Sequence, residues 1–496
     1  MSARKTGLQL ALLGSDAVVF LTSGIVLYGV ISRVAGSALL GQYTLVLSWM
    51  LVFQSIGSFG VPELLMRELG RFPQDRSEHL GAGLVLGIIA SVVVMPIMVA
   101  VSRVAGYDGT MEHALAIAAL SLPGAMILNV ARSGLIVGQR IEFVFATRLF
   151  EFLVVLPLNV VLLFRGHGIE ALTTVLVVGR AASSMLALYL LHRHALRVTW
   201  RPSRASLHTL LSPAVTFATS NSLGMAGMHL NVIMLSLMTP VATVGHYGAA
   251  YKLIESMTLA TVLFGQFYMP RIAHSLAAEP ARGLQPFAMP FGLLFAVTMP
   301  AGIGLMLFPD IIVSLLFGPN FVETVWVLRV MGVFYLVCCF DALLSLVLKA
   351  ASLQRLDLAI LPTNPLANML VNLALIPHAG AVGAAIGQLT GGLCTAGLRY
   401  TFATRRIGQL RWMALAAPWA TAGLCVGGAI VVWGGSIPAW SRLLLYGVLV
   451  MAMVSLAAHS ILTGSERTLQ PGVHGVPTTR KRLRQSAIRW VMNRDE

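Results

Sequence analysis

The chain has 496 residues, of which 57% are hydrophobic and only 11% are charged, and its mean hydropathy is +0.82. A chain this apolar cannot bury all its hydrophobic residues in one water-soluble core. The composition therefore excludes a soluble globular protein and indicates a membrane protein. The net charge of +15 does not call for a nucleic-acid partner, because membrane proteins concentrate cations in their cytoplasmic loops.

Apolar runs of about 20 residues, the length that crosses a bilayer, recur along the whole chain. The first run follows Arg4 and Lys5 and precedes no small-residue cleavage site, so we predict a retained span and not a removed signal peptide. The seventh run is unusually long, and we expect a bend or an unwound portion at 221–227. We predict about fourteen transmembrane helices, at 8–31, 42–61, 80–101, 114–137, 141–164, 169–191, 207–238, 244–267, 286–307, 324–348, 356–376, 382–398, 412–432 and 440–462.

Lys and Arg fall unevenly on alternate connections between these runs. With the N-terminus in the cytoplasm, most of the 34 cations are cytoplasmic, and the loop cations that face outward are Arg33, Arg103, Arg165 and Arg442. Both termini are therefore predicted to be cytoplasmic. The basic segment 480–494 is interpreted as a solvated topology signal, with contact to anionic lipid as the alternative.

Several phrases occur twice in the same order, which indicates an internal repeat. "VVFLTS" at 18–23 is echoed by "VTFATS" at 215–220, and "GQRIEF" at 138–143 by "LQRLDL" at 353–358. Gly41-Gln42-Tyr43 similarly returns as Gly245-His246-Tyr247. We infer two parallel six-helix lobes that enclose a central cavity and rock to alternate access. The predicted divisions are an N-terminal lobe (1–204), a C-terminal lobe (205–408), two accessory helices (409–463) and a basic cytoplasmic tail (464–496).

Ionisable residues inside the predicted spans are the candidate functional groups, because such residues normally face the bundle interior. Arg180 leads, since about eleven apolar residues on either side place it too deep to snorkel easily. The candidates for substrate binding are Arg180, Lys252, Glu255, Arg132, Arg148 and Arg329, and those for a coupling proton or sodium ion are Asp16, Asp341 and Glu151.

Each of the other candidates also has a purely structural interpretation. Lys252 and Glu255 are three residues apart and therefore share a helix face, where they can pair with each other, and Arg148 and Glu151 repeat that spacing. Arg132 and Arg329 lie near predicted helix ends, from which they can snorkel. Asp16 and Asp341 can equally neutralise a cation on a neighbouring helix.

The surplus of cations within the spans suits an anionic head group, because phosphate or diphosphate accepts charge-assisted hydrogen bonds from Arg and Lys. The sequence contains no GxxxxGK[ST] phosphate loop, no HExxH motif and no nucleophile–base signature. We therefore predict a transporter and not an enzyme, without a cofactor. The short outward loops also argue against a glycan polymerase or ligase, which remains the third alternative.

Several stretches resemble a known family: "RVAGSALLGQYTL" (33–45), "GSFGVPELLMREL" (57–69), "VGHYGAAYKLIE" (244–255), "LLFGPNFVET" (315–324) and "NMLVNLALIPHAGAVGAAIGQL" (368–389). The chain is similar to the polysaccharide-export flippases of the multidrug/oligosaccharidyl-lipid/polysaccharide superfamily, over nearly all of its length to about Leu462. The resemblance implies an all-α integral membrane fold and the transfer of an undecaprenyl-diphosphate-linked oligosaccharide across the inner membrane, as in O-antigen assembly. It also implies that the bilayer and assembly proteins such as a polymerase are partners.

Within "YKLIE", the resemblance places Tyr251, Lys252 and Glu255 where the family tends to be polar and cavity-facing. A drug-cation antiporter of the same superfamily is the second alternative, although such antiporters typically have twelve helices and favour acids in the cavity. Related lipid II flippases line a cationic groove with arginines of the first helices. Here the first helix offers Asp16 and no arginine, which argues against that substrate.

Overall fold

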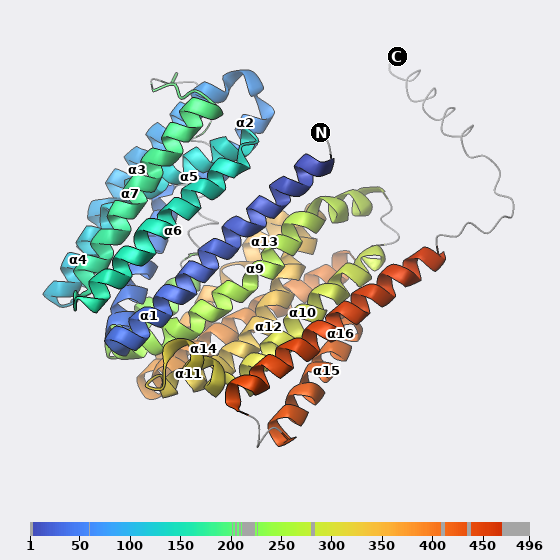
Figure 1. Ribbon diagram of the computed structural model, residues 1–496. Helices are drawn as coiled ribbons and strands as arrows, with labels where there is room; N and C mark the ends of the chain where they lie inside the picture. Colours follow the sequence, from blue (N-terminus) through green and yellow to red (C-terminus); the bar gives the residue numbers. More distant parts are fainter. Residues whose placement is uncertain are drawn as a thin grey trace, which may run out of the picture. The chain divides into compact units, whose positions relative to one another are not determined.

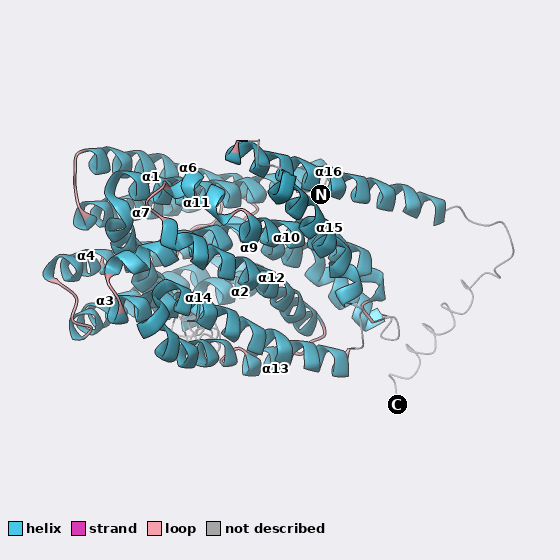
Figure 2. Ribbon diagram, turned by 90° about the horizontal axis from the view of Figure 1, so that it is seen from below, coloured by secondary structure: helices cyan, strands magenta, loops and turns pink. Residues whose placement is uncertain are grey.

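A computed structural model describes residues 3–58, 60–200, 202–203, 206–207, 210, 224–225, 227–278, 283–407, 412–433 and 438–468. The described secondary structure is entirely helical, as Figure 2 shows, and nine of the described helices are long and apolar enough to cross a membrane. The predicted all-α membrane class is therefore confirmed. The chain forms two compact units, Met1–Gly447 and Val448–Glu496, so the predicted lobe boundaries at 204 and 408 both fall inside the first unit and stay predictions.

The N-terminal helices follow the predicted spans closely (Figure 1). One helix, α1, covers the first two predicted spans, and its backbone leaves helical geometry at Gly36, where φ is +80°. Only glycine adopts such a φ readily, so the kink falls between the two apolar runs. The fourth predicted span is divided into α4 and α5. The bounds are α1 (Ala3–Ser58), α2 (Val61–Arg71), η1 (Pro73–Asp75), α3 (Arg76–Val104), α4 (Gly109–Ala119), α5 (Ser121–Val137), α6 (Ile141–Phe164) and α7 (Ile169–His194).

The C-terminal helices repeat this behaviour. Helix α14 covers the eleventh span from its eighth residue on and all of the twelfth, with a non-helical Gly380 (φ +50°) between the two, and α13 holds the start of the eleventh. The seventh predicted span is represented by the helix Gly227–Met238, and most of its predicted bend lies outside the described residues. The bounds are α9 (Val241–Ala278), η3 (Gln285–Phe287), α10 (Ala288–Leu307), α11 (Pro309–Phe317), α12 (Val322–Ala350), α13 (Gln354–Ile360), α14 (Thr363–Arg406), α15 (Trp412–Trp433) and α16 (Ala439–Thr468).

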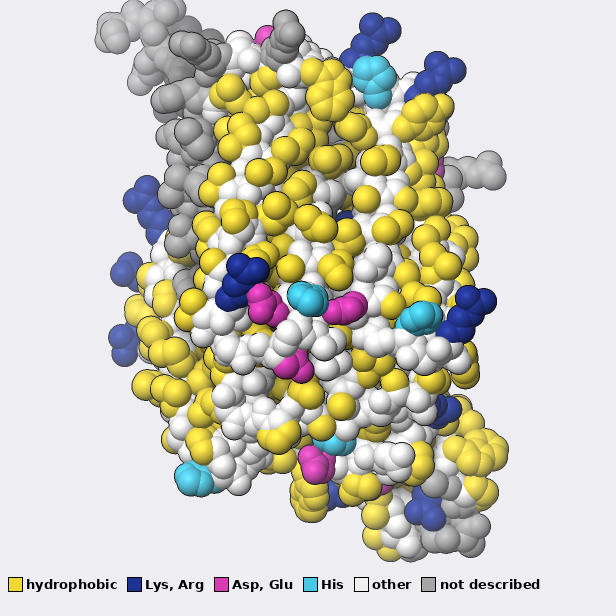
Figure 3. Space-filling view, turned by 90° about the vertical axis from the view of Figure 1, so that its left-hand side faces the viewer, with side chains coloured by type: hydrophobic (Ala, Val, Ile, Leu, Met, Phe, Trp, Pro, Cys, Tyr) yellow, Lys and Arg dark blue, Asp and Glu magenta, His cyan; other side chains and the backbone are white. Residues whose placement is uncertain are grey.

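Large apolar side chains remain exposed midway along the outer helices. Ile89 of α3, Leu153 of α6 and Met185 of α7 are all more than half exposed, and hydrophobic side chains cover much of the face in Figure 3. Apolar exposure on this scale marks an interaction surface and not a water-facing one. Together with the lengths of the helices, it describes a multi-pass membrane protein.

Two glycines allow α1 and α9 to lie close together. A Cβ atom on Gly41 would overlap the carbonyl oxygen of Val241, and a Cβ atom on Gly245 would overlap the carbonyl oxygen of Ser37. The two pairs are reciprocal, because 245 − 41 and 241 − 37 are both 204. Reciprocal contacts of this kind arise when two like elements are related by a rotation axis, which supports the predicted parallel repeat.

The repeated segments GQRIEF (138–143) and LQRLDL (353–358), called the doubled phrase below, both contain the same kind of turn. The spacing of the two turns differs slightly from that of the letters. Gln139 and Ser352 both have positive φ, at +58° and +62°, and each precedes a helix by two residues. In each turn a nitrogen bonds back five residues, from Arg140 to Leu135 and from Leu353 to Leu348, both at 2.9 Å. The turns are 352 − 139 = 213 residues apart, whereas the two repeated segments are 353 − 138 = 215 residues apart in the sequence. Glu142 and Asp357 therefore occupy different positions on their helices.

The buried apolar residues divide along the length of the helices. The largest cluster joins both predicted lobes, with Leu115 of α4, Tyr247 of α9 and Met331 of α12 among its members. Towards the ends predicted to be cytoplasmic, one smaller cluster contains residues of α9, α10, α12 and α14, and another contains residues of α2, α3, α5, α6 and α7. The predicted lobes thus share the largest cluster, and each of these two smaller clusters belongs to one lobe. A further small cluster joins Leu64 of α2 and Ala82 of α3 to Leu210, at the start of the predicted C-terminal lobe.

Candidate functional site

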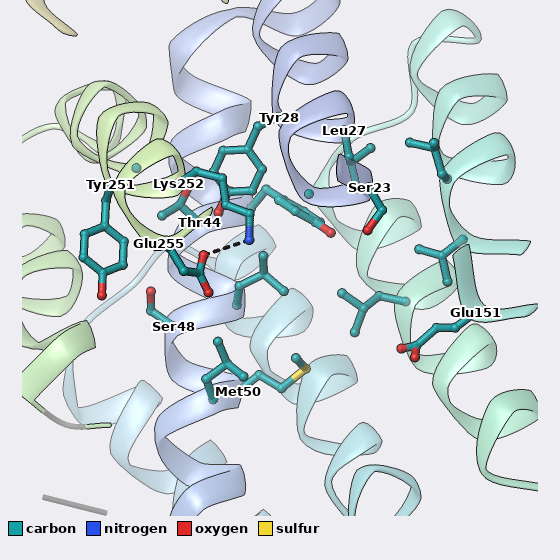
Figure 4. A pocket seen from close by; sticks show the side chains of 18 of the residues that line it. Ser23, Leu27, Tyr28, Thr44, Ser48, Met50, Glu151, Tyr251, Lys252 and Glu255 are labelled. Atoms are coloured by element: carbon teal, nitrogen blue, oxygen red, sulfur yellow. Dashed lines mark hydrogen bonds and ion pairs between the residues drawn. The ribbon is translucent and has the colours of Figure 1, made fainter. Parts of the chain in front are cut away.

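A cavity with about 1110 Å³ of empty volume lies between α1, α6, α7, α9 and the helix Gly227–Met238. Helices of both predicted lobes therefore contribute to its wall. Figure 4 shows Lys252 and Glu255 reaching into it from α9, and Glu151 from the opposite side. The charged residues that line it are Arg148, Glu151, Arg180, Lys252 and Glu255.

On one side of the cavity, a single carboxylate is surrounded by three arginines of three helices. Arg180 of α7 donates from Nε to Glu151 at 3.2 Å and from Nη1 to Gln54 at 3.1 Å. Arg132 of α5 lies 3.6 Å and Arg148 of α6 lies 3.8 Å from the same Glu151 carboxylate. The formal charge of this Glu151 cluster is 3 − 1 = +2. Ionised groups this poorly hydrated are stable only when paired, and Glu151 supplies that pairing.

On the other side, the Lys252 ammonium lies 2.8 Å from the Glu255 carboxylate. The same ammonium is 5.7 Å from the centre of the Tyr28 ring, within cation–π range. Gly24 of α1 leaves room for the lysine, because a Cβ atom there would overlap Lys252 Cε. Lys252 and Glu255 therefore pair with each other, as their spacing predicted, and both also line the cavity.

Among the residues that the structure describes, the charges on the cavity wall do not cancel. Three cations, Arg148, Arg180 and Lys252, face two carboxylates, Glu151 and Glu255, which leaves a formal charge of 3 − 2 = +1. Arg132 stands directly behind Glu151 and raises the local excess to +2. In a site shielded by apolar helices this excess acts at short range and attracts an anion.

A second cavity, with about 850 Å³ of empty volume, adjoins the first. Its wall comes from α9, α12, α14 and the helix Gly227–Met238, and it shares Tyr251 and Glu255 with the first cavity. Its other charged residues are Asp341 and Arg399. Arg399 donates from Nη1 to Asp341 and, at 2.8 Å, from Nε to Asp357.

Asp357 extends this Arg399 cluster away from the cavity. Its second oxygen accepts from Ser345 at 3.0 Å and lies 3.6 Å from the Lys349 ammonium. The Arg399 cluster therefore contains two carboxylates and two cations, and its formal charge is zero. It connects α12, α13 and α14.

Buried amides connect the same part of the protein. Asn231 donates to Tyr247 at 2.7 Å and to Gln388 at 2.6 Å, and Gln388 also accepts from Asn368 at 2.9 Å. Asn372 donates to Asn231 at 2.6 Å. Such networks fix the packing of neighbouring helices, because an unsatisfied amide is costly in an apolar interior.

The structure separates the sequence candidates into groups. Arg180, Lys252, Glu255, Arg148 and Glu151 line the first cavity, Arg132 lies behind it, and Asp341 lines the second. Arg329 is elsewhere, 3.3 Å from Asp310 and stacked on Trp326. The side chain of Asp16 lies outside the described part of the structure. Both described coupling-ion candidates, Glu151 and Asp341, are paired with arginine, and their coupling role stays a prediction.

Sequence reasoning missed Arg399 and Asp357. The predicted span ended at 398, so Arg399 was assigned to a cytoplasmic loop; α14 in fact continues to Arg406, and Arg399 is buried. Asp357 lies at the start of the predicted span 356–376 and was not among the candidates, but it too is buried. The available signal was Asp341, an acid deep in a span that requires a cation on a neighbouring helix.

Comparison with known proteins places this arrangement in a family. A family model described as "Polysaccharide biosynthesis protein" matches residues 30–326, more than half of the chain. No curated protein sequence matches this chain.

Solved structures of membrane transporters share the fold. "Lipid II flippase MurJ, inward closed conformation" is similar with a TM-score of 0.73 at 10% identity, covering 92% of this chain and 99% of that one. An inward-facing MATE multidrug resistance transporter of the MOP superfamily gives 0.61 at 16%, covering 81% and 96%. A MOP superfamily transporter from Pyrococcus furiosus gives 0.54 at 16%, covering 80% and 93%. At these identities the likeness concerns the fold, and the family model supplies the membership: the chain belongs to the polysaccharide biosynthesis protein family.

Proposed function

We propose that the protein is a flippase that moves an undecaprenyl-diphosphate-linked oligosaccharide repeat unit across the cytoplasmic membrane, with both chain termini in the cytoplasm. The product would enter surface polysaccharide assembly, as for O-antigen. The observation that carries the proposal is the cationic excess of the first cavity, where Arg148, Arg180 and Lys252 outnumber Glu151 and Glu255. Membership of a polysaccharide biosynthesis family supports the same substrate class.

The arginines are suited to a diphosphate. A guanidinium carries five N–H donors in a planar fork, and Arg180 uses Nε and Nη1 for Glu151 and Gln54. Its remaining donors can bind phosphate oxygens bidentately, which is stronger than a neutral hydrogen bond. Glu151 keeps the arginines in place before the substrate arrives, so that the substrate finds a preorganised site.

The division of the cores supports alternating access. The predicted lobes share the largest core cluster, and each has a smaller cluster of its own towards the ends predicted to be cytoplasmic, where the contact of Leu210 with Leu64 and Ala82 also lies. This division supports a state that admits substrate from the cytoplasm. The predicted lobes also meet at the contact between Gly41 and Gly245 of α1 and α9. Substrate binding to the opposite state would shift the population towards the outward opening.

The alternatives fit the cavity less well. A drug-cation antiporter would place a cation among three basic side chains with a net positive charge, which is electrostatically unfavourable. A lipid II flippase would also carry a diphosphate, so the cavity charge does not oppose it, but the matched family concerns polysaccharide biosynthesis.

The test is the side of the membrane on which the lipid-linked repeat unit accumulates when the gene is deleted. The proposal expects accumulation in the cytoplasmic leaflet, measured by protection from a membrane-impermeant glycosidase, and loss of surface polysaccharide. Re-expression of the wild-type chain restores both. Accumulation of unpolymerised units in the outer leaflet would overturn the proposal in favour of a polymerase or ligase, and unchanged lipid-linked pools would favour the antiporter.

A further inference from the structure

We propose that the second cavity binds the sugar portion of the transported lipid while the first cavity binds its diphosphate. This inference rests on the proposed function and adds a carbohydrate site to it. The two cavities share Tyr251 and Glu255, which lie one helical turn apart on α9. A single head group can therefore extend from one cavity into the other past these two side chains.

The charges of the two cavities assign the two parts of the head group. Glu255 lines both cavities and is counted in both. Among the described residues, the first cavity then has three cations against two carboxylates, 3 − 2 = +1, and the second has Arg399 against Asp341 and Glu255, 1 − 2 = −1. A diphosphate is therefore attracted to the first cavity and repelled from the second, whereas neutral sugars pay no such penalty there.

The second cavity also offers the hydrogen-bond acceptors that sugar hydroxyls need. Asp341 Oδ2 accepts from Arg399, whereas its Oδ1 is buried and accepts from no group in the described part of the chain. The Asp341 side chain is 17% exposed and lines the cavity wall, and a sugar hydroxyl that donates to this carboxylate would form a charge-assisted bond. Asn364 of α14 lines the same wall and adds an amide donor and acceptor.

The rest of the wall is apolar and includes Tyr251, Phe334 and Pro365. Small-molecule pockets usually combine such apolar surface with a few convergent polar groups, and the wall of the second cavity has both. A coupling cation is the competing occupant. It is disfavoured because Asp341 is already neutralised by the Arg399 guanidinium.

The experiment measures binding of two lipids to the full-length protein in nanodiscs. The probes are undecaprenyl diphosphate and the undecaprenyl-diphosphate-linked oligosaccharide extracted from the membranes of the source organism. We expect the wild type to bind the glycosylated lipid more tightly. Asp341→Asn and Asn364→Ala should each reduce this preference by about fivefold, the effect of one hydrogen bond, while the affinity for undecaprenyl diphosphate stays the same. Arg180→Ala should weaken the binding of both lipids.

Two further results make the test decisive. Asp310→Asn removes an exposed carboxylate that pairs with Arg329 away from both cavities, and it should leave both affinities unchanged. Equal binding of both lipids by the wild type, or equal weakening of both by Asp341→Asn and Asn364→Ala, would overturn the sugar site and leave the flippase proposal standing. Failure of the wild type to bind either lipid would overturn the proposed function itself. A changed sodium or proton dependence of transport in Asp341→Asn, with the sugar preference intact, would assign the cavity to a coupling ion.

Discussion

The Glu151 cluster and the Arg399 cluster both bury one ion among partners of opposite charge, yet they differ in which charge is in excess. Around Glu151, one carboxylate faces three arginines, and the surplus is +2. Around Arg399, one guanidinium bridges two carboxylates, and Lys349 brings the sum to zero. Both clusters lie in the same compact unit.

This difference indicates what each cluster does. Loss of one arginine from the Glu151 cluster leaves the carboxylate with two remaining partners, and Arg180 keeps donors that Glu151 and Gln54 do not use and that can bind an anion. Loss of Arg399 leaves Asp341 and Asp357 with much of their charge uncompensated, because Lys349 lies near Asp357 only. The first cluster is therefore expected to determine transport, whereas Arg399 of the second is expected to determine stability.

The largest expected effect is on transport, at Arg180. Arg180→Ala removes one of the three cations of the cavity wall and the hydrogen bonds to Glu151 and Gln54. We expect export of the polysaccharide to be abolished while the amount of protein in the membrane is unchanged, as measured by immunoblotting and surface-polysaccharide staining. Arg103→Ala is the matched control, because Arg103 pairs with Glu112 on the exposed surface. Normal export in Arg180→Ala would remove this residue from the site.

The next effect is on stability, at Arg399. Arg399→Ala leaves buried carboxylates without their bridging cation, and breaking a buried pair in this way costs about 3 to 5 kcal/mol. We expect a lower melting temperature of the purified protein and less protein in the membrane. Arg180→Ala, measured in parallel, should leave both nearly unchanged. If Arg399→Ala melted like the wild type and only transport were lost, the distinction between the clusters would fail.

The sequence predicted the fold well because its signals are long and repeated. Fourteen apolar runs each correspond to a helix or part of one, and the kinks at Gly36 and Gly380 fall in the gaps between runs. The boundaries were less certain, because a span does not stop where hydropathy falls. Helix α14 continues beyond the predicted end at 398, and that extension buries Arg399.

The candidate site was only partly accessible to sequence reasoning. Depth within a span identified Arg180 and Glu151, and spacing identified the pair of Lys252 with Glu255. Partners on other helices leave no local pattern, so neither the contact between Arg180 and Gln54 nor the bridge between Arg399 and Asp357 was foreseen. Depth did set Arg329 apart, since it lies near a predicted helix end and pairs with the exposed Asp310. The same criterion did not identify Arg132, which is largely buried beside Glu151.

A smaller effect tests the relation between the predicted lobes. Gly41→Ala and Gly245→Ala each place a methyl group against a backbone carbonyl of the other helix. Such overpacking costs about 1 to 3 kcal/mol, so both variants should lower the melting temperature by similar amounts.

The double variant Gly41→Ala/Gly245→Ala tests whether the two glycine contacts depend on the same approach of α1 to α9. Once α1 and α9 have separated, the second methyl group has little left to displace, so the double variant should destabilise by less than the sum. Gly168→Ala is the control, since a Cβ atom there meets nothing within 4 Å. Clearly unequal single effects would contradict the reciprocal geometry.

The smallest effect on stability is expected at Glu142. It contrasts with the effect expected at Asp357, the corresponding acid in the second copy of the doubled phrase. The Glu142 side chain is 45% exposed and lies 3.4 Å from Arg140, and exposed ion pairs contribute about 0 to 1 kcal/mol. Glu142→Gln should therefore leave the melting temperature within error of the wild type. Asp357→Asn should lower it clearly, because that carboxylate is buried against Arg399 and accepts from Ser345. Equal changes in melting temperature for the two variants would contradict this difference in burial.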